Sequence, residues 1–278
     1  MKIWISFDME GVAGVVDWEQ CRPSGGPKYQ VGCELTLGEV NASIEGAVAA
    51  GATTVVVNDS HGAMANLDPR RLAGGARYIS GRHKPLYMMQ GLDGSVDGIF
   101  CIGYHGSISG RPSTLSHSYN PDVFTAARIN GELVGETGIN ALVAEHYGVP
   151  FALLAGDAVT WQEGQKFAAD AEHVRTKESI TRFCAENLHP DESCELIRAA
   201  AERAVRRLAA EGMRAPGLPR PTSLELEMLT ADMAEVATWA RGVERIADRA
   251  VRISGDDLLT VFQSFVAVSY ITRQAGGR

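Results

Sequence analysis

The sequence lacks an excess of positive charge. Of its 278 residues, 26 are Lys or Arg and 34 are Asp or Glu, which gives a net charge of -8. The arginines between residues 198 and 220 alternate with Ala, Glu and Leu at helical spacing, which is typical of a solvated helix face. Nucleic acids and anionic membranes would repel such a chain, because nothing in it offsets their phosphates. We therefore expect neither of them as a partner.

Cysteine is scarce and the apolar runs are short. The chain has an odd number of cysteines and no CxxC pair; they are Cys21, Cys33, Cys101, Cys184 and Cys194. This set is typical of reduced thiols rather than of a disulfide framework. No run approaches the ~18 apolar residues of a membrane span, and Asp8 and Glu10 arrive before a segment of signal-peptide length could form. We expect a cytoplasmic protein.

Three common functional motifs are also missing. The glycines at 11 and 14 lack the GxGxxG spacing of a dinucleotide loop. Lys28 follows Pro27 and precedes neither Ser nor Thr, which excludes a Walker A loop, and no GxSxG elbow is present. The sequence therefore argues against these nucleotide-binding and serine-hydrolase sites.

The sequence does contain four short apolar runs, each of which stops at polar residues: 2–7, 53–57, 98–102 and 150–154. Continuous runs without period-two alternation are typical of strands buried on both faces of a parallel sheet. Helical patterns fill intervals between them, at 34–50 and 136–147. We predict an α/β fold with a mostly parallel sheet flanked by helices.

The last third of the chain has a different pattern. A helix is predicted over 190–212 and is followed by a Pro- and Gly-rich stretch at 212–221. Beyond it we expect a strand, a helix, a strand and a final helix, at 223–229, 230–240, 245–254 and 256–272. The sequence thus predicts an α/β domain at 1–185 and a smaller α+β domain or appendage at 186–278.

Acidic and imidazole side chains stand where the predicted strands end. Asp8 and Glu10 follow the first strand, His61 follows the second and His105 the third, while Glu136 opens a predicted helix. Ligands of open parallel sheets bind outside the carboxyl ends of the strands, so these side chains are expected to meet at one edge. Carboxylate oxygens and imidazole nitrogens are a donor mixture that Zn²⁺ accepts.

The number of donors is sufficient for two metal ions. With Asp8 bridging, Glu10 and His61 complete one ion, and His105 and Glu136 complete the other. Two such ions that share a water molecule are typical of hydrolytic sites. From the residues alone, hydrogen-bonded structural histidines remain an equal alternative.

Two further residues have open roles at this stage. His117, after the small-residue loop 106–113, is either free for proton transfer or capped by the neighbouring serines, and the residues alone favour the cap. Asp157, at the end of the fourth strand, either supports the site or forms a turn.

Seven segments then occur in a recognisable order: FDMEGVAGV, VNDSHGAMANL, ISG, GYHG, LSHS, NGELVGETGINA and AGD. With them the chain resembles the D-aminopeptidases of the DppA type, the M55 peptidase family, whose members are often labelled as dipeptide-transport proteins. The resemblance spans nearly the whole chain and is dense up to about residue 160. The 17–30 loop and the C-terminal third depart from the family's composition.

The resemblance implies a cytoplasmic dinuclear zinc aminopeptidase that releases N-terminal D-amino acids, as from D-Ala-D-Ala, and assembles into a homodecamer. Its metal ligands map onto Asp8, Glu10, His61, His105 and Glu136. Its catalytic histidine maps onto His117. The resemblance thus implies a catalytic role where the residues alone favour a loop histidine capped by the neighbouring serines. Two alternatives stay open: a dinuclear hydrolase of other small amides or L-peptides, and a non-catalytic dipeptide-binding accessory of a transporter.

Overall fold

The computed structural model describes residues 1–275, and its largest element is a seven-stranded sheet that we call sheet A. Sheet A has the strand order β3-β2-β1-β4-β7-β8-β9, and neighbouring strands run parallel except for β8 and β9. Its strands are β1 (Lys2–Phe7), β2 (Thr54–Asp59), β3 (Arg77–Ile79), β4 (Gly98–Tyr104), β7 (Phe151–Asp157), β8 (Glu172–Thr181) and β9 (Cys184–Asn187).

The middle of sheet A consists of the four predicted apolar runs. β1, β2, β4 and β7 have hardly any exposed residues, because both of their faces are covered. β8 and β9 were not predicted, since these strands at one end of the sheet are rich in charged and polar residues. The predicted α/β fold with a mostly parallel sheet is confirmed.

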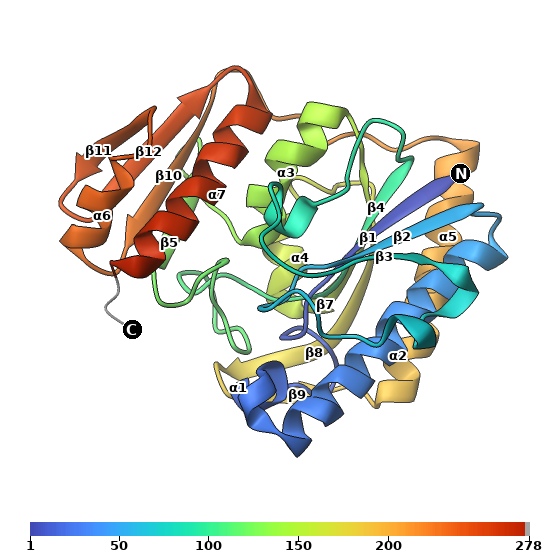
Figure 1. Cartoon of the computed structure of the whole chain (residues 1–278). Coiled ribbons are helices and arrows are strands. Elements are labelled where there is room, and N and C mark those ends of the chain that lie inside the picture. Colours follow the sequence, from blue (N-terminus) through green and yellow to red (C-terminus); the bar gives the residue numbers. More distant parts are fainter. Residues whose placement is uncertain (276–278) are drawn as a thin grey trace.

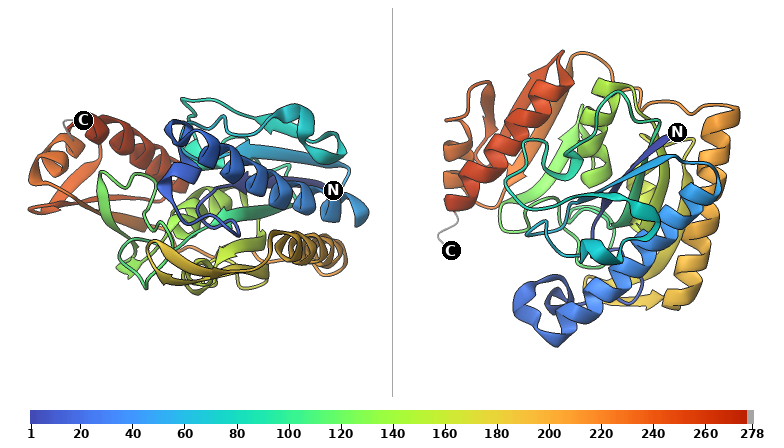
Figure 2. Two further views of the ribbon diagram at one scale, coloured as in Figure 1. Left: turned by 90° about the horizontal axis from the view of Figure 1, so that it is seen from below. Right: turned by 45° about the vertical axis from the view of Figure 1, so that its right-hand side comes forward.

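Helices cover both faces of sheet A (Figures 1 and 2). On one face α2 (Pro27–Ala49) and α5 (Pro190–Ala210) pack against each other and against the sheet. On the other face lie α3 (Glu136–Tyr147) and α4 (Ala158–Gly164). α3 has the predicted bounds, whereas α2 begins at Pro27, seven residues before the predicted start at Glu34, because Pro fits the first turn of a helix.

A second, antiparallel sheet, sheet B, packs beside α3 (Figure 1). Its strand order is β11-β12-β10-β5-β6, and α7 packs against α3 and β12. Its elements are β5 (Phe124–Ile129), β6 (Glu132–Leu133), β10 (Thr222–Met228), α6 (Ala231–Ala237), β11 (Val243–Ala247), β12 (Ala250–Gly255) and α7 (Leu258–Gln274). The strand expected at 245–254 is in fact most of a hairpin, β11 and β12.

The order of the elements along the chain does not follow the division into two sheets. β5 and β6 precede α3 in sequence yet belong to sheet B, whereas α5 follows residue 185 yet packs on sheet A. The division into domains at residues 185 and 186 stays a prediction. Among residues 1–275, the structure has no helix with the length and apolar character of a membrane span.

Short elements occupy the loops near the carboxyl ends of the strands and along α2. They are α1 (Trp18–Cys21) and the 3-10 turns η1 (Pro23–Gly25), η2 (Pro69–Arg71), η3 (Ala73–Gly75) and η4 (Tyr87–Met89). α1 begins with a capping box in which the Asp17 side chain accepts from the Glu19 N–H and the Gln20 side chain returns to the Asp17 N–H.

The chain leaves β1 in close contact with β4. The Asp8 N–H donates to Ile102 O at 2.8 Å, and the Gly11 N–H donates to Gly103 O at 2.8 Å, so pairing continues beyond Phe7. Gly103 has a φ of +72°, and a Cβ there would overlap the carbonyl oxygen of Asp8. Only glycine fits this crossing, which holds Asp8 and Glu10 at the edge of the sheet.

We predict that Gly103→Ala lowers the free energy of unfolding by about 3–5 kcal/mol, because it adds a backbone clash to positive-φ strain. Gly131→Ala is the matched control, since Gly131 has a φ of +85° and nothing within 4 Å of an added Cβ. Its loss should be about 1–2 kcal/mol. Urea unfolding measures both, and equal losses would show that the crossing does not require glycine.

Candidate metal centre

The five predicted metal ligands lie together at the carboxyl edge of sheet A. Asp8 and Glu10 follow β1, His61 follows β2, His105 follows β4, and Glu136 is the first residue of α3. All five residues are buried, with exposed fractions between 1% and 7%. The structure therefore brings every member of the predicted set into one place.

The Asp8 carboxylate stands between two imidazoles. Its Oδ1 lies 2.8 Å from Nδ1 of His61, and its Oδ2 lies 3.6 Å from Nε2 of His105. Glu10 Oε2 is 3.1 Å from the same His61 nitrogen, and Glu136 Oε2 is 3.8 Å from the same His105 nitrogen. The donor atoms thus form two adjoining groups, and Asp8 belongs to both.

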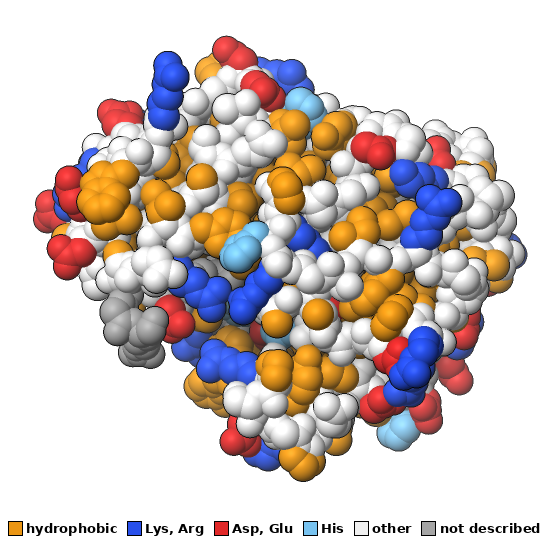
Figure 3. Space-filling view, in the orientation of Figure 1, with side chains coloured by type: hydrophobic (Ala, Val, Ile, Leu, Met, Phe, Trp, Pro, Cys, Tyr) orange, Lys and Arg blue, Asp and Glu red, His pale blue; other side chains and the backbone are white. Residues whose placement is uncertain are grey.

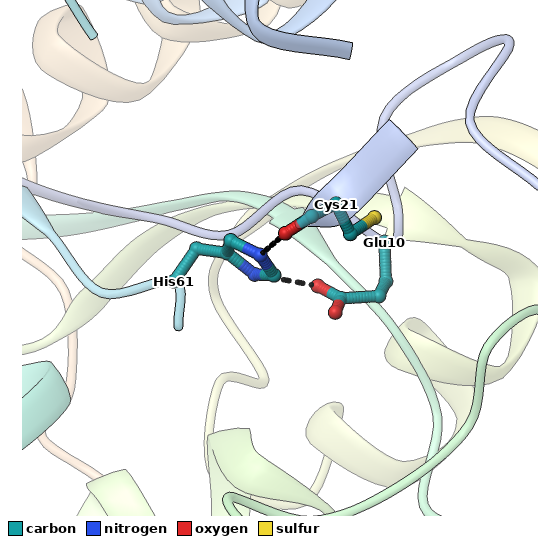
Figure 4. A group of neighbouring side chains, drawn as sticks. All are labelled: Glu10, Cys21 and His61. Atoms are coloured by element: carbon teal, nitrogen blue, oxygen red, sulfur yellow. Dashed lines mark hydrogen bonds and ion pairs between the residues drawn. The ribbon is translucent and has the colours of Figure 1, made fainter. Parts of the chain in front are cut away.

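Backbone carbonyls orient the two imidazoles. Nε2 of His61 is 2.6 Å from the carbonyl oxygen of Cys21 (Figure 4), and Nδ1 of His105 is 3.0 Å from the carbonyl oxygen of Gly106. A carbonyl oxygen only accepts hydrogen bonds, so each of these nitrogens carries a proton. The opposite nitrogen of each ring faces the carboxylates, an orientation typical of metal-binding histidines.

Within residues 1–275, two buried donor atoms of the ligand set, His105 Nε2 and Glu136 Oε2, have no hydrogen-bond partner, and Glu10 Oε2 has only its ion pair with His61. An unpartnered buried polar atom costs roughly 1–3 kcal/mol, and a charged one costs more. Donor atoms of Asp8, Glu10 and His105 also lie within 4.8 Å of one another. A divalent cation would supply the missing partner, and the oxygen and nitrogen donors suit Zn²⁺.

The pKa values show how strongly this site attracts positive charge. Burial alone would lower the pKa of both histidines, yet the neighbouring carboxylates raise that of His61 well above its usual value and that of His105 to about 10. Burial raises the pKa of Glu136 to about 8, although His105 opposes the shift. Burial would also raise the pKa of Asp8, but the two histidines hold it well below its usual value. Without metal, protons supply the positive charge, and a cation would displace them.

His117 lies beside the second donor group. Its Nδ1 is 2.9 Å from the carbonyl oxygen of Leu115, its Nε2 is 3.9 Å from Glu136 Oε1, and its ring stacks on His105 with centroids 4.4 Å apart. Burial, followed by the charge of His105, lowers the pKa of His117 to about 4. The ring is therefore neutral near pH 7, with Nε2 as its acceptor atom. Its partner is a backbone carbonyl, and no neighbouring serine caps it.

A cavity of about 350 Å³ opens onto the donor atoms. Basic side chains gather around a hollow near the middle of the face in Figure 3. The wall also includes residues that sequence analysis did not assign to the site, namely Trp18, Cys21, Arg22, Arg82, Tyr87, Tyr119, Asn120, Asp122 and Arg273. These residues come from α1, η4, α7 and the loops between them, and no motif marks them in the sequence.

Two of these residues touch the ligand set directly. The Tyr119 N–H donates to Glu136 Oε1 at 2.7 Å. The Cys21 thiol lies within 4.8 Å of donor atoms of Glu10 and His61 (Figure 4), and burial together with the charge of Glu10 raises its pKa well above the usual value. Cys21 is thus a neutral thiol beside the site.

Comparison with known proteins identifies the family of this chain. The family model of the M55 peptidases, described as D-aminopeptidase, matches residues 1–267. The chain belongs to the M55 peptidase family. It is 32% identical to the D-aminopeptidase of Bacillus subtilis (strain 168) over 274 residues, which cover 97% of each chain. The solved structure of the zinc-dependent D-aminopeptidase DppA from Bacillus subtilis, a self-compartmentalizing protease, matches it with a TM-score of 0.92 and 30% identity, covering 99% of this chain and 98% of that one.

Membership in this family confirms the predicted resemblance and makes the chain a peptide hydrolase. The roles of Asp8, Glu10, His61, His105 and Glu136 as ligands, and of His117 as catalytic residue, remain predictions. Asp157 forms a helix cap rather than a free turn, and its support of the site stays a prediction. It caps α4 by accepting from the Thr160 N–H, and it accepts from Ser113 Oγ at 2.5 Å, which fixes the loop after His105.

A buried lysine supports the loop after β1, which carries Asp8 and Glu10. Lys177 on β8 donates to the carbonyl oxygens of Glu10, at 2.9 Å, and Val15. Glu39 on α2 accepts from the Ala13 N–H at 2.9 Å. Burial lowers the pKa of Lys177 to about 8 and raises that of Glu39 to about 7, so both charges depend on local partners.

We predict that Lys177→Met lowers the free energy of unfolding by about 3–5 kcal/mol, because it leaves the buried carbonyl oxygens of Glu10 and Val15 without their donor. Lys166→Met is the matched control, since its pair with Glu132 is exposed and should contribute little. Thermal and urea unfolding measure both variants. A Lys177→Met protein as stable as the control would exclude this supporting role.

Proposed function

We propose that this M55 peptidase is a dinuclear zinc aminopeptidase that hydrolyses short peptides with an N-terminal D-amino acid, such as D-Ala-D-Ala. The zinc-dependent D-aminopeptidase of Bacillus subtilis, similar over 99% of this chain, supports both the metal and the substrate class. Assembly into a homodecamer is part of the proposal, and it is supported by the self-compartmentalizing nature of that relative. The cytoplasmic location stays a prediction.

The position of Asp8 carries the proposal of two metal ions. Its two oxygens face different imidazoles, at 2.8 Å from His61 and 3.6 Å from His105. We assign Glu10 and His61 to one ion, His105 and Glu136 to the other, and Asp8 to both. A single-ion site would leave one of the two groups of buried donors uncompensated.

The chemistry that two bound zinc ions supply is Lewis acidity toward the scissile carbonyl and toward a water molecule. His117 provides the proton transfer. Because its Nδ1 proton is held by Leu115 O, its Nε2 is free to accept a proton from the water molecule that attacks the carbonyl carbon, and His117 then gives that proton to the leaving amine as the C–N bond breaks.

The central experiment combines metal analysis with a substrate panel. We expect about two zinc ions per chain after metal-replete purification, and hydrolysis of D-Ala-D-Ala that chelator abolishes. Matched L-Ala-L-Ala and D- and L-alanyl p-nitroanilides separate a D-aminopeptidase from a hydrolase of L-peptides or other amides. Protein without zinc, or without turnover of any substrate in the panel, would end the proposal and favour the peptide-binding alternative.

We predict that His117→Ala retains two zinc ions but loses about 10²-fold or more in kcat, since it removes a proton carrier and no ligand. Glu136→Gln is the matched comparison, because it changes a neighbouring residue assigned as a ligand. It should weaken one metal site while the circular dichroism spectrum stays unchanged. Loss of zinc from His117→Ala would instead make His117 a ligand.

A further inference from the structure

Two arginines line the metal cavity from different parts of the chain. Arg82 lies in the loop after β3, and Arg273 lies on α7. Both also line a neighbouring cavity of about 280 Å³, whose other wall residues include His83 and Tyr270. The two guanidinium groups therefore stand where the metal cavity meets the next one.

Neither arginine is neutralised within the described part of the chain. No carboxylate of residues 1–275 lies within 4.0 Å of the Arg82 or Arg273 side chain. Other arginines, such as Arg77, also lack a carboxylate partner among the described residues, but Arg82 and Arg273 line the metal cavity. Unpaired guanidinium groups that face a cavity are suited to bind an anionic ligand.

The charges of the cavity are separated. Its inner end holds the carboxylates of the ligand set, whereas its wall carries Arg82, Arg273 and Arg22. Asp122 is the one additional carboxylate of the wall among the described residues. Arg22 is already engaged, because its guanidinium stacks over the Trp18 ring at 4.8 Å from the centroid. Arg82 and Arg273 remain as the open anion-binding pair.

A short free peptide has the complementary arrangement of charge. Its amino group is cationic and its terminal carboxylate is anionic, and in an extended dipeptide they are separated by at most ~7 Å. A cavity of about 350 Å³ is near the lower end of the usual range for ligand sites, which suits a ligand of this size. With the amino end at the metals, the carboxylate points toward the wall.

We propose that Arg82 and Arg273 bind the free C-terminal carboxylate of the substrate and thereby make this enzyme selective for free dipeptides. The inference rests on the proposed peptidase function and adds to it the recognition of the substrate's far end. Because both arginines line the metal cavity as well as the next one, they can bind a chain that ends within the metal cavity. Peptide amides and longer peptides lack a carboxylate at that position.

The test compares kcat/KM for D-Ala-D-Ala and D-Ala-D-Ala-amide, which differ only in the terminal carboxylate. We expect the zinc-loaded wild-type enzyme to prefer the free acid by ~10–100-fold, the range of a charge-assisted contact. Arg82→Met and Arg273→Met should each reduce this ratio, mainly through KM, and the double variant should bring it close to one. Arg82→Lys and Arg273→Lys, which keep the charge, should retain part of it.

Arg77→Met on β3 is the matched control, an exposed arginine outside both cavities, and should leave the ratio unchanged. Equal wild-type activity on the two substrates would overturn the carboxylate site while leaving the peptidase intact. A fall of the ratio in Arg22→Met, with no change in the Arg82 and Arg273 variants, would also overturn it. Absence of turnover on both substrates would instead contradict the proposed function itself.

Discussion

The burial of three carboxylates in one cavity is the constraint on which the rest of this structure depends. Asp8, Glu10 and Glu136 are each at most 3% exposed, and like charges so close together are unstable without compensation. His61 and His105 supply positive charge from within the fold. The backbone N–H of Tyr119 donates a further hydrogen bond to Glu136. The site is therefore arranged to hold cations, whether protons or metal ions.

Much of this centre could be predicted because parallel strands place their carboxyl ends at one edge. An uninterrupted apolar run identifies a fully buried strand, so the first polar residue after it has a known position. This argument located Asp8, His61 and His105, and the helix start located Glu136. It depends on local pattern alone, which is why it succeeded without knowledge of the sheet order.

The remainder depends on contacts between distant segments that leave no local pattern. Lys177 supports Glu10 from 167 positions away, and its strand β8 is too polar to resemble a buried strand. Arg273 reaches the cavity only because α7 packs beside α3. Sheet B is difficult to predict for the same reason. Its strands β5 and β10 pair, for example at Ile129 and Leu224, although they are far apart in the sequence.

The orientation of the imidazole rings has a consequence for which side chains could ever replace them. His61 presents Nδ1 to the carboxylates, whereas His105 presents Nε2. The amide group of asparagine reaches about as far from the backbone as Nδ1, and that of glutamine about as far as Nε2. At position 61 only asparagine should place a polar group where Nδ1 lies, and at position 105 only glutamine should do so where Nε2 lies. Two residues of the same type therefore differ in the side-chain length that could replace them.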